Sequence, residues 1–568
     1  MRLIKKGILL NTFVCLCLSG IAQTPTLEWV NRIGVDTLTH GWGAAIVADA
    51  AGNVYTTGSF SDTTDFDPGP GIYNLISNGW VDAFVSKSDP AGNLIWVTRV
   101  VGGATGDVPH AIVLDSIGNI YVTGAYDVNE SGDNSMFIVK LDTSGTIGWL
   151  KQIGLGANSD VQSFSLTVDL SGNTYLSGYF KTLSPWTLDF DPGVGTAIHT
   201  SYGSSQDIFI LKLDSTGNFV WVKQIGGTAP GGDDAKKIII DPTGNLLVGG
   251  RFSGTVDFDS GPGTNSLTSA SSSAFLLKLD TSGNFIWVKN TGSSTNQASS
   301  ESVVFDAFGN IFISGTFTGT TDFDPGSGTY NLVADSSSTD ISLLKLDPAG
   351  NFLWAKRIGG SISAYAGLNI AQDPAGNFYL TGFFGGIVDF DPGAGIFYLY
   401  NSTATMNIFI LKLNTNGDFL WAVSFDGNQF SRGYSIFVDG FGNVYTTGSF
   451  GGTVDFDPGP GVVNSNCASL SIFNIFVHKM NQVITGYSEH QVMNDIGLYP
   501  NPTNSIVTLS GIEKESTIEI FNVLGEKIIS IQCQNTSVDL NLSELANGIY
   551  FVKVGSEKGT LTKRIVKQ

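Results

Sequence analysis

The chain has little positive charge and no long apolar run beyond its first residues. Its 568 residues include 29 Lys and Arg against 50 Asp and Glu, which gives a formal net charge of −21. Nucleic acids and anionic membranes are bound through basic patches, so this balance argues against either as a partner. No segment after residue 22 is apolar over the length that a membrane-spanning helix needs, and no transmembrane segment is predicted.

Cysteine and histidine are also scarce. Only Cys467 and Cys533 remain after the leader, in different regions of the chain, so the sequence predicts no disulfide framework. The five histidines show no metal-ligand spacing. Gly-x-Ser-x-Gly, His-Glu-x-x-His and Gly-Lys-Ser/Thr motifs are missing, so the sequence offers no recognised serine-hydrolase, zinc-protease or phosphate-loop signature.

Glycine and aromatic residues, by contrast, are abundant. The chain contains 71 Gly, and 42% of its residues are hydrophobic and 11% aromatic. That much apolar side chain can form a core, which argues against disorder, and the glycines follow no three-residue period, which excludes collagen. Many tight turns between short strands are predicted, in an all-β fold.

The first 22 residues have the pattern of a secretory signal peptide. A basic start precedes a mostly apolar stretch at 8–18, and small residues follow at Gly20 and Ala22. Neither Cys15 nor Cys17 follows the small residue that a lipoprotein signal requires, so no lipid anchor is predicted.

One unit recurs seven times in the middle of the chain. A Gly-Asn turn leads into an aromatic-rich strand that closes on a glycine, and these glycines are Gly58, Gly124, Gly178, Gly250, Gly315, Gly382 and Gly448. A period near 66 residues indicates an array or a propeller. Within the first unit, alternation and Asp…Gly-Asn hairpins predict strands at 44–49, 54–60, 83–87 and 94–99.

The seventh unit lacks its fourth strand. Six units end in a tryptophan strand, whereas the matching Leu-Glu-Trp-Val-Asn-Arg-Ile-Gly stretch lies at 27–34, at the start of the mature chain. An N-terminal strand that completes the last sheet joins the two ends and removes open edges. We therefore predict a seven-bladed β-propeller at 23–486, then a linker at 487–494. The repeats, with their Asp-x-x-Gly-Asn-x-Tyr-x-Thr-Gly and Gly-Asn-x-x-Trp signatures, resemble the SBBP-type propeller family, which implies an extracellular setting but no chemistry.

An acidic motif, Asp-Phe-Asp, joins the second and third strands of six units. Two acids flanking one residue point the same way in an extended backbone, so Phe can anchor the loop while both carboxylates face solvent or a cation. The motif lacks the later acids of an EF-hand loop, so two interpretations stay open: a calcium site, or a turn built by Asp and Gly. The acids are Asp65, Asp67, Asp189, Asp191, Asp257, Asp259, Asp322, Asp324, Asp389, Asp391, Asp455 and Asp457.

The tryptophans and the breaks in the repeat offer further candidates. Trp29, Trp96, Trp149, Trp221, Trp287, Trp354 and Trp421 recur at one strand position, which favours packing between blades over sugar stacking. Lys236-Lys237, Arg251, and the segments 127–133 and 181–186 depart from the repeat, through drift or as a binding spot.

The last residues, 495–568, change character. Short alternating runs separated by Gly and Asn predict a small immunoglobulin-like β-sandwich. The opening Tyr499, Pro500, Asn501 and Pro502, the strand with Gly548 and Tyr550, and the terminal Lys563 and Arg564 resemble the C-terminal sorting domain of the type IX secretion system. The resemblance implies the export machinery as a partner and delivery to the outer surface or medium of a Gram-negative bacterium.

Taken together, these features predict an exported, monomeric binding or scaffold module. Its ligand, a glycan or a protein, cannot be named, and Ca²⁺ is the one cofactor that the motifs suggest. The alternative is an extracellular carbohydrate-active enzyme that uses acids on one propeller face.

Overall fold

A computed structural model describes residues 25–34, 40–103, 105–128, 134–155, 159–183, 185–229, 231–292, 296–335, 339–360, 369–401, 405–467, 473–482, 497–501, 503–512, 514, 516–522, 527–546, 548–556 and 559–567. The predicted signal peptide and linker lie outside these residues. The chain divides into unit 1, residues 1–483, and unit 2, residues 484–568. The described residues are all-β, with one 3₁₀ turn (η1, Tyr202–Ser204) and no α-helix; no helix among them could cross a membrane.

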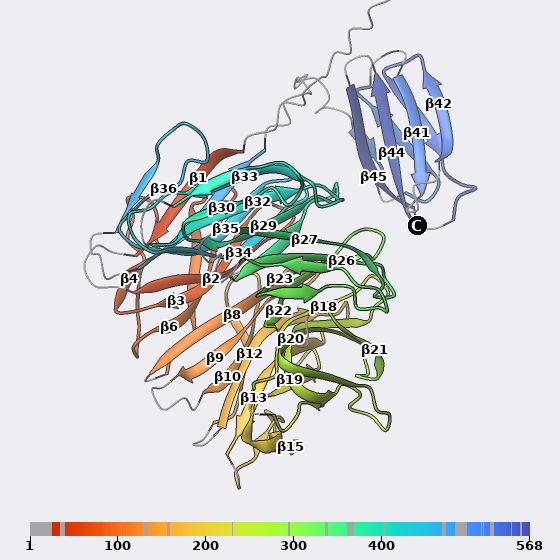
Figure 1. The fold of residues 1–568 in the computed structure, drawn as a ribbon. Coiled ribbons are helices and arrows are strands. Elements are labelled where there is room, and N and C mark those ends of the chain that lie inside the picture. Colours follow the sequence, from red (N-terminus) through yellow and green to blue (C-terminus); the bar gives the residue numbers. More distant parts are fainter. Residues whose placement is uncertain are drawn as a thin grey trace, which may run out of the picture. The chain divides into compact units, whose positions relative to one another are not determined.

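The described part of unit 1 contains seven antiparallel sheets of four or more strands, which we number 1 to 7 (Figure 1). In the first three sheets the four strands pair in chain order. Sheet 1 is β2 (Gly41–Ala48), β3 (Val54–Phe60), β6 (Asp82–Ser88) and β7 (Leu94–Val101). Sheet 2 is β8 (Gly106–Leu114), β9 (Ile120–Val128), β10 (Ser135–Leu141) and β11 (Ile147–Ile153). Sheet 3 is β12 (Ser159–Val168), β13 (Thr174–Thr182), β16 (Asp207–Leu213) and β17 (Phe219–Ile225).

The next three sheets repeat this order with two elaborations. Sheet 4 is β18 (Asp234–Ile240), β19 (Leu246–Asp257), β20 (Ser266–Leu279) and β21 (Phe285–Asn290), and its two middle strands are unusually long. Sheet 5 is β22 (Ala298–Phe305), β23 (Ile311–Phe317), β26 (Asp340–Leu346) and β27 (Phe352–Gly360). The end of β27 also pairs with β30 (Ile387–Asp389), which pairs with β31 (Tyr398–Tyr400). Sheet 6 is β28 (Asn369–Gln372), β29 (Phe378–Phe384), β32 (Asn407–Leu413) and β33 (Phe419–Phe425).

Sheet 7 joins the two ends of unit 1. It consists of β34 (Ser431–Val438), β35 (Val444–Phe450), β38 (Asn474–Asn481) and the N-terminal β1 (Thr26–Ile33), whose Trp29 lies opposite Lys479. The strand expected at 27–34 thus pairs where the sequence predicts. Four short hairpins, which the sequence analysis missed, lie between second and third strands: β4 (Thr63–Asp65) with β5 (Asn74–Ile76), β14 (Leu188–Asp189) with β15 (Ile198–His199), β24 (Thr320–Asp322) with β25 (Asn331–Val333), and β36 (Thr453–Asp455) with β37 (Asn464–Asn466).

The Asp…Gly-Asn hairpins form by local hydrogen bonds, as predicted. Asp49 Oδ1 accepts from the amides of Ala51 and Asn53 at 3.0 and 2.9 Å, and Asn53 Nδ2 donates to the other carboxylate oxygen at 2.8 Å. Gly52 has φ of 82°, a conformation that disfavours other residues. Burial alone would raise the pKa of Asp49, but the hydrogen bonds from Asn53 and Tyr55 outweigh it and lower the pKa.

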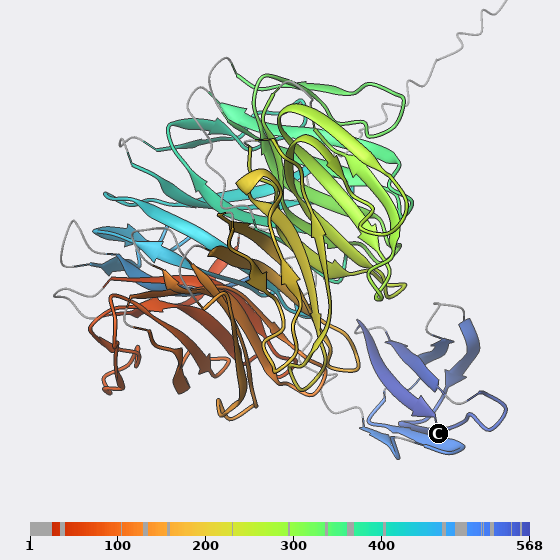
Figure 2. The same ribbon diagram turned by 90° about the horizontal axis from the view of Figure 1, so that it is seen from below.

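Successive sheets pack face to face around unit 1 (Figure 2). The first strands contact one another in the order β2, β8, β12, β18, β22, β28 and β34, and β34 contacts β2. Seven apolar clusters lie between the sheets; the last contains Tyr445 and Val477 of sheet 7 with Val54 and Phe84 of sheet 1. Each sheet therefore has an apolar core on both faces.

Unit 2 consists of two sheets around one core. The order in the smaller sheet is β39 (Gly497–Tyr499), β40 (Ile506–Ser510), β43 (Ser537–Asn541), and in the larger β42 (Lys527–Cys533), β41 (Ser516–Asn522), β44 (Gly548–Ser556), β45 (Gly559–Lys567). Val507 and Leu540 of one sheet share a buried cluster with Ile520 and Val552 of the other.

Candidate functional site

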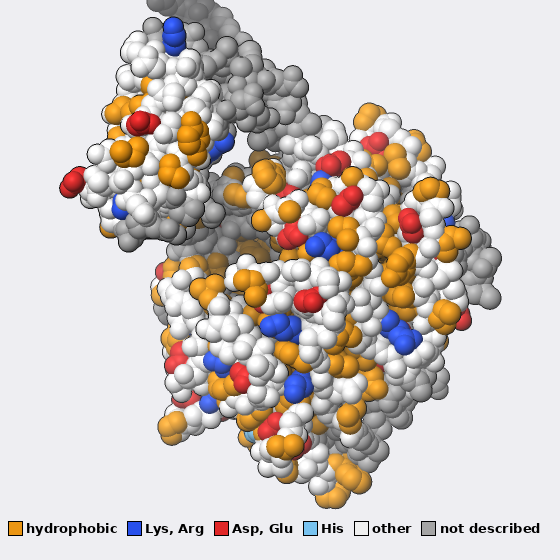
Figure 3. All heavy atoms as spheres, turned by 180° about the vertical axis from the view of Figure 1, so that it is seen from behind, with side chains coloured by type: hydrophobic (Ala, Val, Ile, Leu, Met, Phe, Trp, Pro, Cys, Tyr) orange, Lys and Arg blue, Asp and Glu red, His pale blue; other side chains and the backbone are white. Residues whose placement is uncertain are grey.

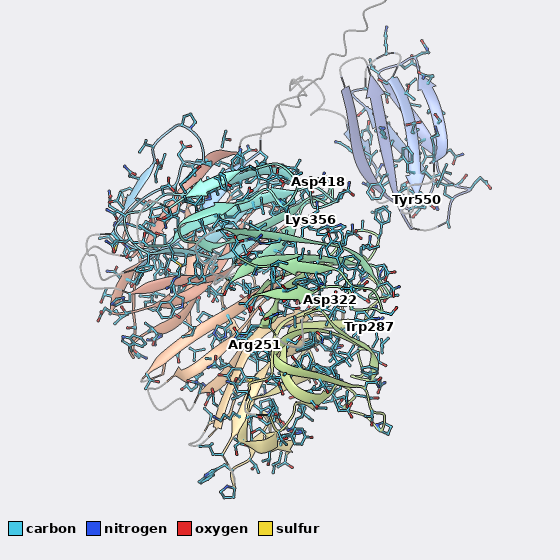
Figure 4. All side chains as sticks on the ribbon, in the orientation of Figure 1. Arg251, Trp287, Asp322, Lys356, Asp418 and Tyr550 are labelled. Atoms are coloured by element: carbon cyan, nitrogen blue, oxygen red, sulfur yellow. The ribbon has the colours of Figure 1, made fainter. Side chains whose placement is uncertain are left out.

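The Asp-Phe-Asp loops are closed by hydrogen bonds to their own carboxylates. Asp65 Oδ1 accepts from the amides of Asp67 and Tyr73 at 3.0 and 2.8 Å, and Asp67 Oδ1 accepts from the amide of Gly69 at 2.7 Å. The same three bonds, at 2.7–3.1 Å, recur in the loops that begin at Asp189, Asp257, Asp322, Asp389 and Asp455; Asp322 is marked in Figure 4. Each acid therefore caps backbone amides of its own loop.

The residues between and after these acids are fixed by packing. Phe66 is buried and meets the rings of Phe60 and Phe84 at 5.3 and 4.8 Å, as the anchoring role predicts. Its equivalents Phe190, Phe258, Phe323, Phe390 and Phe456 are equally buried. A Cβ on Gly71 would come within 2.1 Å of Asp67 Oδ2, so this position requires glycine.

Each Asp-Phe-Asp loop provides few free oxygen ligands for a cation. Ca²⁺ takes six to eight oxygen ligands, whereas each loop supplies two carboxylates whose Oδ1 atoms already accept amide hydrogens. Within the part of the chain that the structure describes, no three His, Cys, Asp or Glu side chains gather closely enough to hold a metal ion. The arrangement favours the turn interpretation.

We therefore expect calcium to leave the stability of the protein unchanged. Adding millimolar Ca²⁺ to the chelated mature chain should not move the melting temperature. Asp67→Ala should lower the free energy of unfolding by about 1 kcal/mol, the usual effect of losing a capping acceptor, and Asp67→Asn by less because it keeps an oxygen. A rise of several degrees with Ca²⁺ that the Asp67 variants abolish would instead establish a calcium loop.

The tryptophans lie between neighbouring sheets. Trp29 Nε1 donates to Pro90 O at 3.1 Å, in the last hairpin of the next sheet, and Trp96 Nε1 to Thr143 O at 3.3 Å. A Cβ on Gly92 or Gly145 would strike these rings at 3.0 and 2.8 Å. The same ring-to-glycine packing recurs for Trp149, Trp221, Trp287 (on β21, Figure 4) and Trp354. The indoles are therefore packing elements, and Gln482 substitutes for the hairpin that sheet 7 lacks, bonding Lys412 and Tyr379.

One acidic loop lies in a groove lined by aromatic residues. Asp389 and Asp391 line a hollow of about 850 Å³ between sheets 5 and 6, together with Trp354, Lys356, Arg357, Tyr330, Tyr398 and Tyr400. The three tyrosines are 42%, 46% and 59% exposed. Arg357 forms ion pairs with Asp335 at 2.6 Å and with buried Asp340 at 2.5 Å. At this groove the loop between the second and third strands of sheet 6 meets the end of β27, the fourth strand of sheet 5.

The residues that break the repeat are partly structural. Arg251 Nε donates to Asp234 Oδ2 at 2.8 Å, and Lys236 Nζ lies 3.4 Å from the same oxygen, so both balance a buried carboxylate (Figure 4). Lys181 is part of β13, and Trp186 is half exposed. Residues 129–133 lie outside the described residues.

Several titratable groups of unit 1 are buried or partly buried. Burial raises the pKa of Asp233 to about 7 and that of Asp207 to about 6, although backbone amides donate to both carboxylates. Burial lowers the pKa of His110 to about 4 and that of His478 to about 3. His478 Nε2 lies 3.2 Å from Phe456 O, so this nitrogen donates and the ring is neutral.

Buried His478 should make the protein less stable in acid. Its pKa in the folded state lies below the unfolded value of about 6.5, so between pH 6.5 and 3 the unfolded chain binds a proton that the folded chain does not. Stability from this group is complete above pH 6.5 and falls by about 1.4 kcal/mol per pH unit below it. The raised pKa values of Asp233 and Asp207 have the opposite effect on stability, so the test compares His478→Gln with the wild type by urea unfolding from pH 7 to 4.5. Parallel plots of the free energy of unfolding against pH for the two proteins would contradict the prediction.

The opening motif of unit 2 is hydrogen-bonded to its last strand. Asn501 Oδ1 accepts from the amide of Val566 at 2.8 Å, and the Thr503 amide donates to Val566 O at 2.9 Å, which ties the opening motif to β45. Tyr550 is buried on β44 and donates to Ala546 O at 2.8 Å, whereas Tyr499 and Pro500 are exposed. Lys563 and Arg564 belong to β45; Pro502 lies outside the described residues.

Comparison with known protein families identifies the type of domain that unit 2 contains. Residues 497–568 match the secretion system C-terminal sorting domain. Such a domain directs a chain to the type IX export machinery, so the protein is secreted or displayed on the cell surface.

Relatives of the remaining chain are distant. An uncharacterized WD repeat-containing protein from Acanthamoeba polyphaga mimivirus is 24% identical over an alignment of 517 positions, which covers 76% of this chain but only 36% of the relative. The chain thus spans about a third of that relative's length. A WD-repeat-like, β-propeller type of all-β fold is therefore supported for unit 1.

Solved structures are less similar still. A protein of unknown function from Dyadobacter fermentans matches at 12% identity and a TM-score of 0.37, covering 81% of this chain and 99% of its own. PorZ, a surface component of the type IX secretion system of Porphyromonas gingivalis, matches at 11% identity and a TM-score of 0.16, covering 95% and 100%. A PQQ-bound aldose sugar dehydrogenase from Streptomyces coelicolor matches at 10% identity and a TM-score of 0.30, covering 66% and 94%.

Proposed function

We propose that the protein is an exported binding module whose unit 1 is a seven-bladed, SBBP-type β-propeller at 23–486. Sheets 1 to 7 are the blades, and the contacts of their first strands in a closed order support this assignment. β1 supplies the fourth strand of the last blade and so covers the edge of β38. A ring of blades that leaves only short outer edges suits a monomer outside the cell.

The groove between sheets 5 and 6 is the contact surface for an extracellular partner. The observation that carries this assignment is its exposed tyrosines, Tyr330, Tyr398 and Tyr400, beside the Arg357–Asp335 ion pair. Tyrosine offers a large rigid apolar face with a polar tip, which suits contacts with glycans or proteins. Elsewhere, on the face that Figure 3 shows, charged side chains are scattered singly and form no basic patch.

The enzyme alternative has weaker support. A glycosidase needs two carboxylates facing one substrate. The acids whose pKa values are most raised, Asp207 and Asp233, are almost fully buried and lie outside the groove between sheets 5 and 6. The paired acids of the Asp-Phe-Asp loops cap their own amides instead.

A glycan array combined with a hydrolase screen tests the proposal on the full mature chain, with and without Ca²⁺. We expect a bound glycan or captured surface protein without turnover, and loss of that binding in a Tyr398→Ala, Tyr400→Ala double variant. Ile286→Ala, at a half-exposed position outside the groove, is the matched control. Turnover, or binding that the double variant retains, would contradict the proposal.

A further inference from the structure

A cavity of about 570 Å³ lies at the centre of unit 1, lined by the first strand of every sheet. It shares Val304 and Gln372 with a groove of about 1,030 Å³ formed by the first hairpins of sheets 4 to 6. Phe308, on the rim of that groove, is 84% exposed. The groove and the cavity therefore adjoin each other at Val304 and Gln372.

In six of the seven first strands, a β-bulge places one residue at this cavity. The register of β2 with β3 shifts between Gly43 and Ala45, which leaves Ala44 unpaired, and equivalent shifts occur in five other first strands. A bulge re-aims the extra residue. The six unpaired residues all line the cavity: Ala44, His110, Phe164, Lys236, Glu301 and Tyr434.

These six residues have different chemistry although their surroundings repeat. The strand that pairs with each bulge carries the recurring glycine, such as Gly58, Gly124 or Gly315, packed against the backbone opposite. The fold thus requires the bulge but not a particular side chain at it. An alanine, a histidine, two aromatic residues, a lysine and a glutamate make one asymmetric ring.

Lys237 is the strongest exception to the repeat. The residues at the same position in the other sheets are small: Ala45, Ala111, Ser165, Ser302, Asn369 and Ser435. Lys237 lines the cavity, and burial lowers its pKa. No hydrogen bond or ion pair holds its ammonium group among the described residues. A partly buried charge without a partner is expensive to retain, so drift alone is a poor explanation.

Other polar groups of the cavity also lack partners within the described residues. The Glu301 carboxylate and the Tyr434 hydroxyl make no hydrogen bond there. His110 Nδ1 lies 2.8 Å from Ser163 O and donates to it, which leaves Nε2 as an acceptor. Lys236, by contrast, is held by Asp234 and lies 3.9 Å above the Phe164 ring. The cavity therefore offers an ammonium donor, a carboxylate, a neutral acceptor and a hydroxyl.

We propose that this cavity binds a neutral sugar of one or two rings. Lys236 is held by Asp234, and among the cavity groups without a partner Lys237 and Glu301 carry opposite charges, so a net anion or cation would meet one group of its own sign. Sugar hydroxyls both donate and accept, and they can serve Lys237, Glu301 and His110 Nε2 together. The apolar face of a sugar ring can lie on Tyr434, and the volume falls in the usual range of ligand pockets, about 300–1,000 Å³.

Calorimetric titration of the full mature chain tests the proposal. The probes are glucose, galactose, mannose, N-acetylglucosamine, maltose and cellobiose, with glucuronate and glucosamine as charged comparators. We expect one or more neutral probes to bind, and Lys237→Ser to weaken that binding about tenfold or more, the loss expected for a charged hydrogen bond. Glu301→Gln should weaken it as well.

The controls separate folding from binding and this cavity from the outer groove. Lys237→Ser introduces the residue found in three other sheets, so its melting temperature should equal or exceed that of the wild type. Lys527→Ser, which removes an exposed ion pair with Glu519 in unit 2, should leave sugar affinity unchanged. The proposal is overturned if no neutral probe binds, if a charged comparator binds more tightly, or if both cavity variants bind normally. Binding lost only in the Tyr398→Ala, Tyr400→Ala variant would overturn this inference and leave the proposed function intact.

Discussion

Removing residues 497–568 should keep the protein from reaching the cell surface or the medium. These residues match the sorting domain, and they fold around a core of their own, so the deletion takes away the export signal without opening the core of unit 1. Immunoblots of cell, surface and medium fractions should show the shortened chain only inside the cell envelope. Its melting transition for unit 1 should be unchanged.

Fusing the sorting domain to a reporter protein tests whether this domain is sufficient for export. Residues 497–568 attached to an unrelated reporter that carries a signal peptide should send the reporter out. Thr508→Ala, which removes an exposed hydrogen bond to Asp539, serves as a control that keeps the core and should be exported normally. Efficient export of the shortened chain would contradict the assignment.

Deleting residues 25–34 should destabilise unit 1 more than any single substitution. β1 places Ile33 and Trp29 in the cluster between sheets 7 and 1, pairs along β38, and forms the Glu28–Lys479 ion pair at 2.9 Å. Arg32 donates to Asn466 O at 2.7 Å and Asn31 to Gly92 O at 2.6 Å. Loss of a tryptophan alone costs about 3–5 kcal/mol, a large part of the 5–15 kcal/mol of a typical domain.

The deletion also exposes β38 as a new sheet edge, which invites aggregation. Calorimetry and light scattering should show a lost or strongly lowered transition together with association. A synthetic peptide of residues 25–34 should restore part of the transition, and Thr26→Ala in the intact chain should be neutral because Thr26 is exposed. A shortened chain that melts like the wild type would contradict the role of β1.

Much of unit 1 was predictable because its signals are local. The Asp49-to-Asn53 turn and the strands around it depend on residues within a few positions of one another, and the structure places them as expected. The pairing of the N-terminal strand could be predicted from the repeats. The seventh unit lacks its fourth strand, and the stretch that matches this strand lies at 27–34. The anchoring role of Phe66 followed from alternation along an extended segment.

The candidate sites were less predictable because they depend on contacts between distant residues. For the Asp65 and Asp67 carboxylates the sequence left a calcium site and a turn open, and only the folded loop shows that their Oδ1 atoms accept amides up to eight positions away. Lys236-Lys237 was noted as a break in the repeat, yet only the bulge of β18 shows that this break faces the centre. The groove near Tyr398 depends on the pairing of β27 with β30, which no local pattern signals.

Cross-linking of β1 to β38 tests the central claim, that the two ends of unit 1 close one ring of sheets. Asn31 lies opposite Val477, so Asn31→Cys with Val477→Cys, in a chain with Cys467→Ser and Cys533→Ser, should form a disulfide. The oxidised chain should migrate faster on a denaturing gel without reductant and should melt at a higher temperature. Asn31→Cys with Ile475→Cys, two positions out of register, should stay reduced. Failure of the first pair to cross-link, or equal cross-linking of the second, would contradict the closed ring.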